Sequence, residues 1–493
     1  MPLPPRPHAL RPGSPPGGDG SGAGVAGAVA PGGLVRLSEV LSALSVALDL
    51  TEGERSGHAA RTCLIGMRLA ETVGLPLPER SALYYALLLK DAGCSSNAAR
   101  MTALFAADDR RLKPATKVAD WPRLCAQVRY ALEHAAPGQP MGKRTLLFLA
   151  LSVAGRRVAR QLVHVRCERG ADIVRKLGLP RATAEAIRSL DEHWDGGGYP
   201  DGLRGESIPL LARICGLSQT LDAFLARFGP VAAIEMARAR SGRWFDPELV
   251  RALGALEGDA DWWEEVATGR AELLVHALEP EDHVLRADDA GLDLLSEVFA
   301  DIIDAKSAFT YRHSRGVAQA SLAVAGALGF DRARLRDLRR AALLHDIGKL
   351  GVSNLILDKP GPLTPDEFAQ VRRHPAFTAD ILGRVAAFRP WAPAAAAHHE
   401  RLDGKGYHLG VPSGDLPVEA RVLMVADVFD ALSADRPYRA ALPRERVLEI
   451  MRGDVGSALC PTCFAAFAAV QDDLPSPQGV GGERGEACAA QPG

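Results

Sequence analysis

Apolar and polar residues follow a helical period along nearly the whole chain. After His313, for example, apolar residues recur at three- and four-residue spacing, at Val317, Ala320, Val324 and Leu328, which places them on one face of a helix. Gly329 follows directly and predicts the end of that helix. Strand-like runs of β-branched and aromatic residues are scarce, and aromatic residues make up only 5% of the chain. The pattern predicts an all-α fold.

Both ends of the chain depart from this pattern. Residues 1–33 consist mainly of Pro, Gly, Ala and Ser, and residues 472–493 have a similar composition. Segments with so few large apolar side chains cannot offset the entropy cost of ordering, so we expect both ends to be disordered. No stretch reaches the roughly 18 apolar residues that a membrane span requires, and the N-terminus has no uninterrupted apolar segment typical of a signal peptide. We expect a cytoplasmic protein without membrane insertion.

Between these ends, the sequence contains a diverged internal repeat. The segment around His58 and Asp91 resembles the segment around His313 and Asp346, and one offset of 255 residues relates both pairs. A period this long indicates two copies of a domain and not a solenoid. We therefore expect two tandem helical-bundle domains: a first copy over residues 34–255, a linker over 256–290 and a second copy over 291–471.

The charge balance of the chain is nearly neutral. The sequence has 58 Lys and Arg against 60 Asp and Glu, which leaves a formal net charge of −2. Such a chain has no overall field that would draw it onto nucleic acid or an anionic membrane. We expect a small-molecule partner, or a signalling protein, and no nucleic acid. The eight cysteines show no spacing typical of a disulfide framework, which favours reduced thiols.

Five histidines and two aspartates of the second copy lie at helix ends or within apolar helices. His345 lies on the apolar face of its helix with Asp346 beside it, and Asp427 lies in a helix that is apolar on almost every side. Buried groups of this kind are costly unless a charged partner satisfies them. A single histidine on an apolar face is most often a core residue, but seven such groups favour a metal site. The set is His313, His345, Asp346, His374, His398, His399 and Asp427.

The types of these seven donors indicate their chemistry. Nitrogen and oxygen donors without a thiolate suit iron, manganese or zinc better than a purely oxygen-loving ion. Seven donors are too many for one tetrahedral ion, so we expect at least two metals. Two adjacent metal ions can clamp and polarise a phosphoryl group and supply a nucleophile near neutral pH. Lys349, three residues after Asp346, can hold a phosphate oxygen as a point charge.

The segment from about 297 to 440 strongly resembles the HD-GYP subgroup of the HD phosphohydrolase superfamily. The matching motifs are YRHS (311–314), LLHDIGKLGV (343–352), ILDKPGPLTPDEF (356–368), HP (374–375), HHERLDGKGY (398–407) and ADVFDALSADRPYR (426–439). The resemblance implies that the seven residues bind two divalent metals, bridged by Asp346, with iron or manganese preferred over zinc, nickel or cobalt. It implies that Asp346 and Lys349 are catalytic, and that the substrate is bound by Lys349, Asp403, Gly404, Gly406 and Tyr407. The usual substrate of the family is cyclic di-GMP, opened to linear pGpG and sometimes on to GMP.

Two positions depart from the pattern of this subgroup. Members with three metals have a glutamate four residues before the first histidine, where this chain has Phe309, so we expect a two-metal centre. The signature tripeptide reads Gly406-Tyr407-His408 and lacks its proline. Because proline would fix the backbone φ angle, its loss is expected to loosen the loop. Alternatively, His408 adds a proton donor near the substrate.

The first copy retains the scaffold but not the donors. Lys90 stands where His345 does, Cys94 where Lys349 does, and Arg166 near the position of His374; Leu190, Asp191 and Gln219 stand opposite His398, His399 and Asp427. Only His58 and Asp91 remain, with Glu54 four residues before His58. We expect that this copy cannot assemble a two-metal centre. Its loop nevertheless reads Gly198-Tyr199-Pro200, which we interpret as a structural turn in preference to a regulatory binding surface.

The repeat also accounts for the pair Cys460 and Cys463. Two cysteines at this spacing are typical of metal or redox motifs, but no second pair accompanies them. The first copy has Asp246-Pro247 where the second has Cys460-Pro461. Proline is favoured at the first helical position and aspartate immediately before it. The repeat therefore predicts that Cys460 replaces a helix N-cap residue.

Three functions remain open from the sequence. The leading hypothesis is a metal-dependent phosphodiesterase that hydrolyses cyclic di-GMP in the second copy, with the first copy as a scaffold. The second is a hydrolase of the same superfamily that acts on another nucleotide or cyclic dinucleotide, which Phe309 and His408 keep open. The third is a non-catalytic signalling adaptor. The complete set of seven donors argues against the third, because a binding module has no need of all of them.

Overall fold

The computed structural model describes residues 34–119, 140–268, 270–280, 285–307, 309–310 and 312–474. We call residues 34–280 the first half and residues 285–474 the second half. The N-terminal segment 1–33, which we expected to be disordered, lies outside the described residues. Of the tail expected over 472–493, the structure describes only residues 472–474, where the short helix η8 (Gln471–Asp473) ends the described chain.

The prediction of an all-α fold is confirmed. The first half contains α1 (Leu37–Glu52), α2 (His58–Thr72), α3 (Leu77–Leu89), η1 (Cys94–Asn97), α4 (Ala98–Phe105), α5 (Asp109–Val118), α7 (Met141–Lys176), α8 (Arg181–Ser189), η2 (Gly205–Ser207), α9 (Leu210–Ala239), α10 (Pro247–Leu253), η3 (Gly254–Leu256), α11 (Ala260–Ala267), α12 (Ala271–Leu274) and η4 (Val275–Leu278). Within the described residues, the strands are β1 (Val35–Arg36) and β2 (Arg286–Ala287), which pair antiparallel.

The second half is built in the same way. It contains α13 (Asp289–Asp304), α14 (His313–Ala327), α15 (Arg332–Leu344), η6 (Ile347–Gly351), α16 (Asn354–Leu357), α17 (Pro365–Val371), α18 (His374–Gly383), α19 (Ala392–Ala396), η7 (Ser413–Asp415), α20 (Val418–Ser433), α21 (Arg444–Asp454) and α22 (Pro461–Val470). The apolar face predicted after His313 lies on α14, where Val317, Ala320 and Val324 are buried. Gly329, at a φ of 78°, follows the helix end as expected.

The two halves repeat one arrangement around α2 and α14. α2 packs on α3 and α9, and α14 packs on α15 and α20. In each half, an aspartate of the preceding helix accepts a hydrogen bond from the first turn. Asp49 Oδ1 lies 3.0 Å from the Ala59 N–H nitrogen, and Asp304 Oδ1 lies 3.3 Å from that of Ser314. The internal repeat read from the sequence is therefore a repeat of structure as well.

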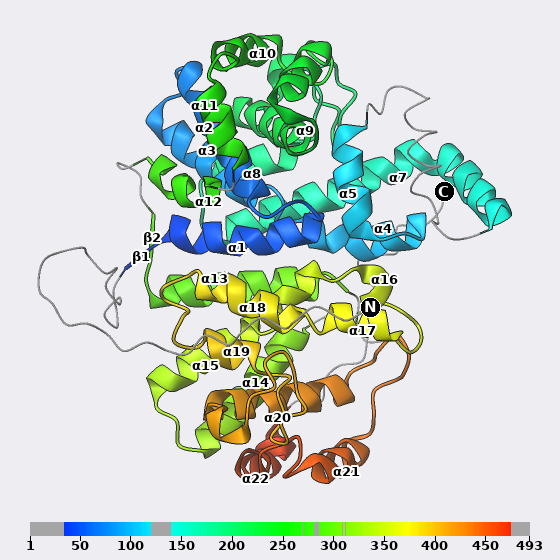
Figure 1. Cartoon of the computed structure of the whole chain (residues 1–493), viewed down its shortest axis with the longest axis vertical. Helices are drawn as coiled ribbons and strands as arrows, with labels where there is room; N and C mark the ends of the chain where they lie inside the picture. The colour runs from blue at the N-terminus through cyan, green and yellow to red at the C-terminus, as the bar shows by residue number, and fades with distance from the viewer. Residues whose placement is uncertain are drawn as a thin grey trace, which may run out of the picture.

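Helix α1 joins the two halves into one molecule. Figure 1 shows the halves stacked, with α1 running along their boundary beside α13 and α18. α1 packs on α2 and α3 of its own half and on η6 and α18 of the second. Its residues are buried nearly all round, as expected of a helix that carries apolar side chains on every face. Most buried apolar residues of both halves form one connected core, and Met101, Ala107, Leu112 and Leu162 form a small separate cluster.

The stretch 256–290, which we expected to be a linker, contains α11, α12 and η4. Trp263 and Val266 of α11 are buried, and α11 packs on α2 and α9 of the first half. The Trp263 indole N–H donates to the Leu256 carbonyl oxygen at 2.9 Å. This segment is thus packed onto the first half up to η4.

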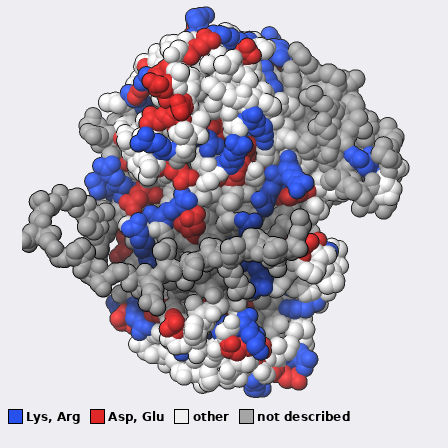
Figure 2. Space-filling model, viewed as in Figure 1, with Lys and Arg blue, Asp and Glu red and all other residues white. Residues whose placement is uncertain are grey.

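The surface carries charges of both signs. In the face shown in Figure 2, lysine and arginine side chains intermingle with aspartate and glutamate over both halves. This mixture fits the near-neutral balance of the chain. Within the described ranges, no helix combines the length and apolar character needed to cross a bilayer.

Candidate metal centre

The structure brings the seven expected donors together from five helices. His313 begins α14, His345 and Asp346 follow α15, His374 begins α18, His398 and His399 follow α19, and Asp427 lies within α20. Six of the seven residues are buried. The exception is His399, whose side chain is 26% exposed. Helix ends converge here because the buried faces of α14, α15, α18, α19 and α20 pack around one centre.

Asp346 lies at the middle of this cluster, and its two oxygens face different histidine pairs. Oδ1 lies 3.3 Å from His374 Nε2 and 3.5 Å from His398 Nε2. Oδ2 lies 3.5 Å from His313 Nε2 and 3.4 Å from His345 Nε2. A carboxylate placed in this way can bridge two cations, one on each of its oxygens.

Asp427 completes the two groups of donors. Its Oδ1 lies 3.3 Å from His313 Nε2, and its Oδ2 lies 3.8 Å from His399 Nδ1. Donor atoms converge within 4.8 Å in three sets: His313, His345 and Asp427; His345, Asp346 and His398; and His374, His398 and His399. The cluster therefore offers two adjoining positions for a cation, with Asp346 between them.

Hydrogen bonds on the far side of the rings aim the histidines inward. The Nδ1 atoms of His345, His374 and His398 each lie 2.7 Å from a backbone carbonyl oxygen, those of Ala342, Val371 and Ala395. A donor proton on Nδ1 leaves the Nε2 lone pair free to bind a metal ion. The ring orientation is thus set by the backbone of the same helix ends.

Buried polar atoms at the centre show that the residues fit a cation. His313 Nε2, His345 Nε2 and Asp346 Oδ1 are buried and have no hydrogen-bond partner within the described residues. Such atoms are costly to bury unless something satisfies them. Because they converge from both carboxylate and imidazole groups, a divalent metal ion suits them better than water or an anion.

The protonation states of the cluster suit metal binding. Burial lowers the pKa of His374 to about 4 and also lowers the pKa values of His398 and His399. Burial by itself would raise the pKa of Asp346, but Lys349 and His345 outweigh it and hold that pKa well below its usual range. His374, His398 and His399 therefore present neutral imidazoles beside the ionised carboxylate of Asp346, the forms that bind cations.

The surroundings of His313 carry an excess of negative charge, which raises the pKa of its imidazole. Burial lowers its pKa, but the surrounding carboxylates of Asp346, Asp427 and Asp430 outweigh burial and hold the pKa well above the ordinary value. Its Nδ1 lies 2.6 Å from Asp430 Oδ2. Three carboxylates around one imidazole favour additional positive charge at this position.

Asp430 is a functional residue that the sequence analysis missed. It lies one turn after Asp427 on α20, so the spacing of three residues within ADVFDAL carried the signal. Gly316, one turn into α14, makes its approach possible: a Cβ on Gly316 would lie 2.1 Å from Asp430 Oδ1. Any larger residue at this position would push the carboxylate away from His313.

The expected substrate loop lies against the cluster and is held by Glu400. This buried carboxylate accepts hydrogen bonds from the backbone N–H groups of Leu409 and Gly410 at 2.8 and 3.1 Å. Gly406 packs tightly in the loop, because a Cβ there would lie 2.4 Å from the Glu400 Cα. Tyr407 places its ring 4.9 Å from that of His399. The loop thus forms one wall of the cluster.

The other expected substrate residues are placed differently. The Lys349 Nζ lies 2.5 Å from Asp346 Oδ2 at the centre, and its side chain is 18% exposed. Asp403 is exposed, and its carboxylate accepts from Arg401 at 2.9 Å and from the Lys405 N–H at 3.1 Å. Gly404 is exposed and adopts a φ of 70°. Asp403 and Gly404 therefore shape the turn, whereas Lys349 and Tyr407 reach the donors.

In the first half, lysine side chains occupy the equivalent place. Lys90 forms an ion pair with Asp91, and the Lys117 Nζ lies 3.2 Å from His58 Nε2. Lys117 also lies 3.0 Å from Glu52 Oε2 and 4.0 Å from Asp91 Oδ1. A set of possible donors remains at Glu52, Asp91 and Cys94, but these ammonium groups already balance its carboxylates.

The Gly-Tyr-Pro loop of the first half is held as its counterpart is. Glu192 accepts from the N–H groups of Asp201, Gly202 and Leu203 at 2.7, 3.1 and 2.9 Å. The peptide bonds Tyr199–Pro200 and Tyr407–His408 are both cis. The Pro200 carbonyl oxygen accepts from Arg160 Nε at 2.9 Å. These internal bonds favour our interpretation of the first loop as a structural turn.

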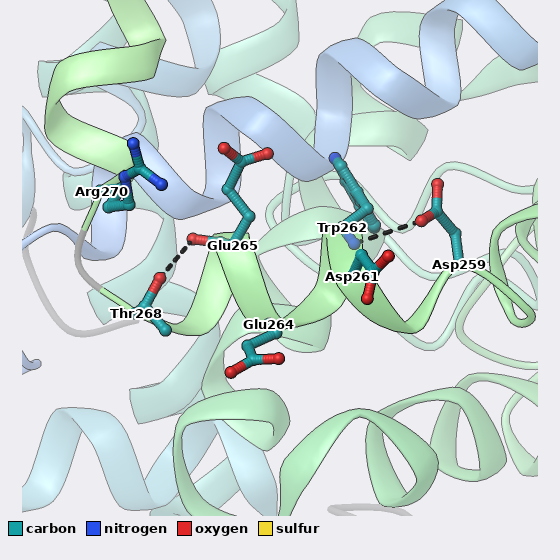
Figure 3. A pocket seen from close by; sticks show the side chains of 7 residues that line it. All are labelled: Asp259, Asp261, Trp262, Glu264, Glu265, Thr268 and Arg270. Atoms are coloured by element: carbon teal, nitrogen blue, oxygen red, sulfur yellow. Dashed lines mark hydrogen bonds between the residues drawn. The ribbon is translucent and has the colours of Figure 1, made fainter.

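A hollow elsewhere on the molecule is lined by charged residues of α11 and its ends. Its lining residues are Asp259, Asp261, Trp262, Glu264, Glu265, Thr268 and Arg270. Figure 3 shows the glutamates and Asp261 pointing apart, with dashed lines joining Thr268 to the Glu265 carbonyl oxygen and Trp262 to Asp259. None of the seven donors lines it. It therefore plays no part in the metal centre.

The fold and the donor set define a family. A family model described as HD domain matches residues 156–249 and 297–461, which together make up more than half of the chain and fall in both halves. The chain belongs to the HD domain family, as a member of its HD-GYP group, and is a metal-dependent phosphohydrolase. The resemblance read from the motifs is thereby confirmed.

Two relatives and one solved structure show how similar the chain is to individual members of this family. The 3'3'-cGAMP-specific phosphodiesterase 3 of Vibrio cholerae is 42% identical over 439 residues, which are 89% of this chain and 95% of the relative. A crystal structure of a cyclic GMP-AMP-specific phosphodiesterase of V. cholerae matches with a TM-score of 0.64 at 39% identity, over 90% of this chain and 99% of that chain. A cyclic di-GMP phosphodiesterase of Pseudomonas aeruginosa is 37% identical over 42% of this chain and 49% of its own.

Proposed function

We propose that the second half holds two divalent metal ions and hydrolyses a 3'3'-linked cyclic dinucleotide. The observation that carries this proposal is the position of Asp346, whose two oxygens each face a separate pair of imidazoles. Two metal ions, when bound, would polarise the phosphodiester and lower the pKa of an attacking water. Iron or manganese suits the donors best, with zinc, nickel or cobalt as alternatives.

The residues of the chain have distinct roles in this proposal. His313, His345 and Asp427 would hold one cation and His374, His398 and His399 the other, with Asp346 between the two groups of donors. Lys349 Nζ, beside Asp346 at 2.5 Å, turns to donate to a phosphate oxygen of the substrate. Tyr407, with Arg372 5.0 Å from its ring, forms the wall against which a base packs.

The first candidate substrate is 3'3'-cGAMP. The V. cholerae relative that matches along nearly its full length bears this specificity in its name. Cyclic di-GMP, the expectation from the sequence, is the second candidate, supported by cyclic di-GMP phosphodiesterases that match a shorter part of the chain. His408 is the position where the chain departs from the Gly-Tyr-Pro tripeptide, and its Nδ1 is buried without a hydrogen-bond partner among the described residues, so it is the residue to vary when the two candidates are compared.

Substrate choice is tested by kinetics on the purified, metal-loaded full chain. We expect linear product from 3'3'-cGAMP at a higher kcat/KM than from cyclic di-GMP, measured by chromatography. His408→Pro, which restores the signature tripeptide, is expected to shift that ratio toward cyclic di-GMP. A higher kcat/KM for cyclic di-GMP in the unaltered chain would replace the first candidate by the second. Turnover of neither dinucleotide would overturn the proposal.

The metal assignment is tested with a matched pair of variants. Asp346→Asn is expected to lose bound metal and turnover together, because an amide cannot bridge two cations. Asp91→Asn changes the equivalent residue of the first half, and we expect it to retain both metal content and kcat. Metal content is measured by elemental analysis and folding by circular dichroism. Equal losses in both variants would show that the assignment of one active half is wrong.

The same proposal places the enzyme in the cytoplasm. The six described cysteines, Cys63, Cys94, Cys167, Cys215, Cys460 and Cys463, form no disulfide with one another. Reduced thiols are the usual state of cysteines in that compartment. A cyclic dinucleotide is the partner we propose, and neither nucleic acid nor a lipid bilayer is needed.

A further inference from the structure

The last α-helix of the described residues, α22, begins beside a pair of cysteines. Cys460 is the N-cap residue of α22, Pro461 occupies its first turn, and Cys463 follows three residues after the cap. Both cysteines are buried, at 6% and 1% exposure, whereas Pro461 and Thr462 between them are exposed. The two thiols therefore lie beneath an exposed turn of the chain.

In the first half, the position equivalent to Cys460 is occupied by a hydrogen-bonded carboxylate. There, Asp246 is the N-cap of α10 and is followed by Pro247. Its Oδ2 accepts from Arg213 Nη1 at 2.7 Å, and its Oδ1 accepts from the Glu248 N–H at 2.8 Å. The position thus holds an anion, stabilised by an arginine and by the N-terminus of a helix.

The second half keeps the arginine but replaces the carboxylate. Arg421 Nε donates to the Leu416 carbonyl oxygen at 3.0 Å, just as Arg213 Nε donates to that of Ile208 at 2.9 Å. Arg421 is therefore held as Arg213 is, and it lies beside Cys460. A site built for a carboxylate contains a thiol, the side chain that can supply a negative charge by losing one proton.

The two thiols of the pair differ in acidity. Burial raises the pKa of Cys460, but the N–H groups of Cys463 and Thr462, the Cys463 thiol and Arg421 outweigh burial and lower it. Burial and the neighbouring Cys460 raise the pKa of Cys463 to about 12. Lowered thiolate pKa values at helix N-termini, beside cations and in Cys-X-X-Cys motifs mark reactive cysteines.

We propose that Cys460 and Cys463 form a redox-active dithiol, with Cys460 as the attacking thiolate and Cys463 as the resolving thiol. N-cap and N3 side chains meet across the first turn of a helix, so a disulfide between them closes without moving the chain far. The repeat explains why Cys460 stands at the N-cap of a helix. The retained Arg421 gives a physical reason for the reactivity of the Cys460 thiol.

The reaction balances with a low-molecular-weight disulfide as oxidant. The Cys460 thiolate attacks one sulfur of that disulfide, the sulfur–sulfur bond breaks, and one thiolate leaves. Cys463 gives its proton to the departing thiolate and attacks the Cys460 sulfur, which releases the second thiolate. The external disulfide is reduced by two electrons to two thiols, and the protein dithiol is oxidised to one disulfide.

The pair stands next to the segment that anchors the substrate loop. The N–H groups of Leu402 and Asp403 donate to the carbonyl oxygens of Ala458 and Ser457 at 3.4 and 2.8 Å. These carbonyls lie two and three residues before Cys460. α22 also packs on α14 and α20. Oxidation of the dithiol would therefore take place next to the substrate loop and to α14 and α20, the helices that carry donors of the metal centre.

Peptide mapping of the full chain tests the proposal. The reduced protein is treated with oxidised glutathione, quenched with N-ethylmaleimide and digested. We expect the peptide that contains Cys460 and Cys463 to become lighter by two hydrogen atoms and to carry no maleimide. Cys215, buried with a raised pKa, serves as an internal control that stays reduced. A peptide with maleimide on both cysteines would overturn the proposal.

Variants separate the two roles. Cys463→Ser is expected to stop at a glutathione adduct on Cys460, whereas Cys460→Ser should leave Cys463 without an adduct. Cys460→Asp restores the residue of the first half and keeps the helix cap, so its folding should be unchanged and its oxidation lost. Arg421→Met should slow alkylation of Cys460 by iodoacetamide, and Arg213→Met should not. An adduct on Cys463 in Cys460→Ser, or equal alkylation rates, would contradict the assigned roles.

Discussion

His313 and His58 form the same histidine–aspartate pair but face different surroundings. His313 Nδ1 lies 2.6 Å from Asp430 Oδ2, and His58 Nδ1 lies 2.5 Å from Asp222 Oδ2. In the second half, Nε2 of the histidine points at the carboxylates of the cluster. In the first half, it points at the Lys117 ammonium, 3.2 Å away. At the residue scale, the aspartate orients the ring in both halves, but the ring faces carboxylates in the second half and an ammonium group in the first.

Asp430→Asn is therefore expected to weaken metal binding without removing a ligand. Loss of the charge behind a ligating histidine typically lowers metal affinity about 10- to 100-fold. Titration of the metal-free protein with Mn²⁺, followed by turnover, measures the change. Asp222→Asn makes the same substitution in the first half and should leave the affinity unaltered. Identical affinities in all three proteins would contradict the role of Asp430.

Asp49 carries the clearest pH dependence of a single residue. Burial raises its pKa to about 7, whereas an aspartate in the unfolded chain titrates near pH 3.9. Between these values the folded state holds a proton that the unfolded state has lost. The resulting stability is fully present below about pH 4 and is lost as the pH rises through about 7.

Asp49→Asn removes this dependence. The amide oxygen can still accept from the Ala59 N–H, as Oδ1 does at 3.0 Å, and no charge has to be buried. We expect the variant to be more stable than the unaltered chain above about pH 7, by up to about 4 kcal/mol, with the difference vanishing toward about pH 4. Chemical denaturation at a series of pH values measures it. A difference that stays constant over this range would contradict the assignment.

At the scale of elements, α5 supplies positive charge to the buried polar site of the first half. It sends Lys113 and Lys117 into the buried site, where Lys113 Nζ lies 3.5 Å from Glu52 Oε1 and donates to the Thr51 carbonyl oxygen at 3.0 Å. Burial lowers the pKa of Lys117, but Asp91 and Glu52 outweigh it and hold that pKa above its ordinary value. A helix of the chain itself thus supplies the positive charge that metal ions are proposed to supply in the second half.

Lys117→Met is expected to destabilise the protein. The substitution leaves Glu52 and Asp91 buried with less compensation, and breaking one side of a buried ion pair typically costs about 3–5 kcal/mol. The free energy of unfolding from denaturant titration measures the loss. Lys176→Met removes a lysine that is 52% exposed and paired with Asp301 at the surface, and it should change stability by less than about 0.5 kcal/mol. If the two variants lost equal stability, the buried lysine would have no special role.

At the scale of the whole molecule, a buried polar cluster links the halves. Lys306 of the second half lies 3.3 Å from Asp109 Oδ2 of α5, with side chains 2% and 0% exposed. Asp109 Oδ1 also accepts from the Asn354 N–H at 3.1 Å, at the start of α16. Burial lowers the pKa of Lys306 to about 8, although Asp109 opposes the shift. Helix α5 therefore reaches the buried polar site of the first half and, through Asp109, also contacts Lys306 and Asn354 of the second half.

Asp109→Asn is expected to cost about 3–5 kcal/mol, because it leaves Lys306 buried beside a neutral partner. Adding Lys306→Met should recover most of that loss, since the double variant no longer buries the Lys306 ammonium without a charged partner. A double-mutant cycle on the free energy of unfolding gives the coupling. If the double variant is as unstable as Asp109→Asn alone, charge burial is not the cause of the loss.

The donors of the metal centre could be predicted because their signals are local. His345-Asp346 and His398-His399 are neighbours in the chain, and each lies at the end of an apolar helical pattern. Asp430 was missed because its role depends on which histidine α20 faces. Lys117 was missed because nothing near it in the sequence shows that α5 turns toward His58. Both depend on packing between elements that are far apart in the chain.

The sequence by itself determined the helical period and the repeat and predicted the seven candidate donors, since these follow from side-chain chemistry at short spacing. Only the tertiary structure decided that each oxygen of Asp346 faces its own imidazole pair, that lysines fill the first site, and that Asp109 meets Lys306 across the boundary. Such contacts join residues tens to hundreds of positions apart. Their geometry is set by how helices pack around a shared core, which no local pattern encodes.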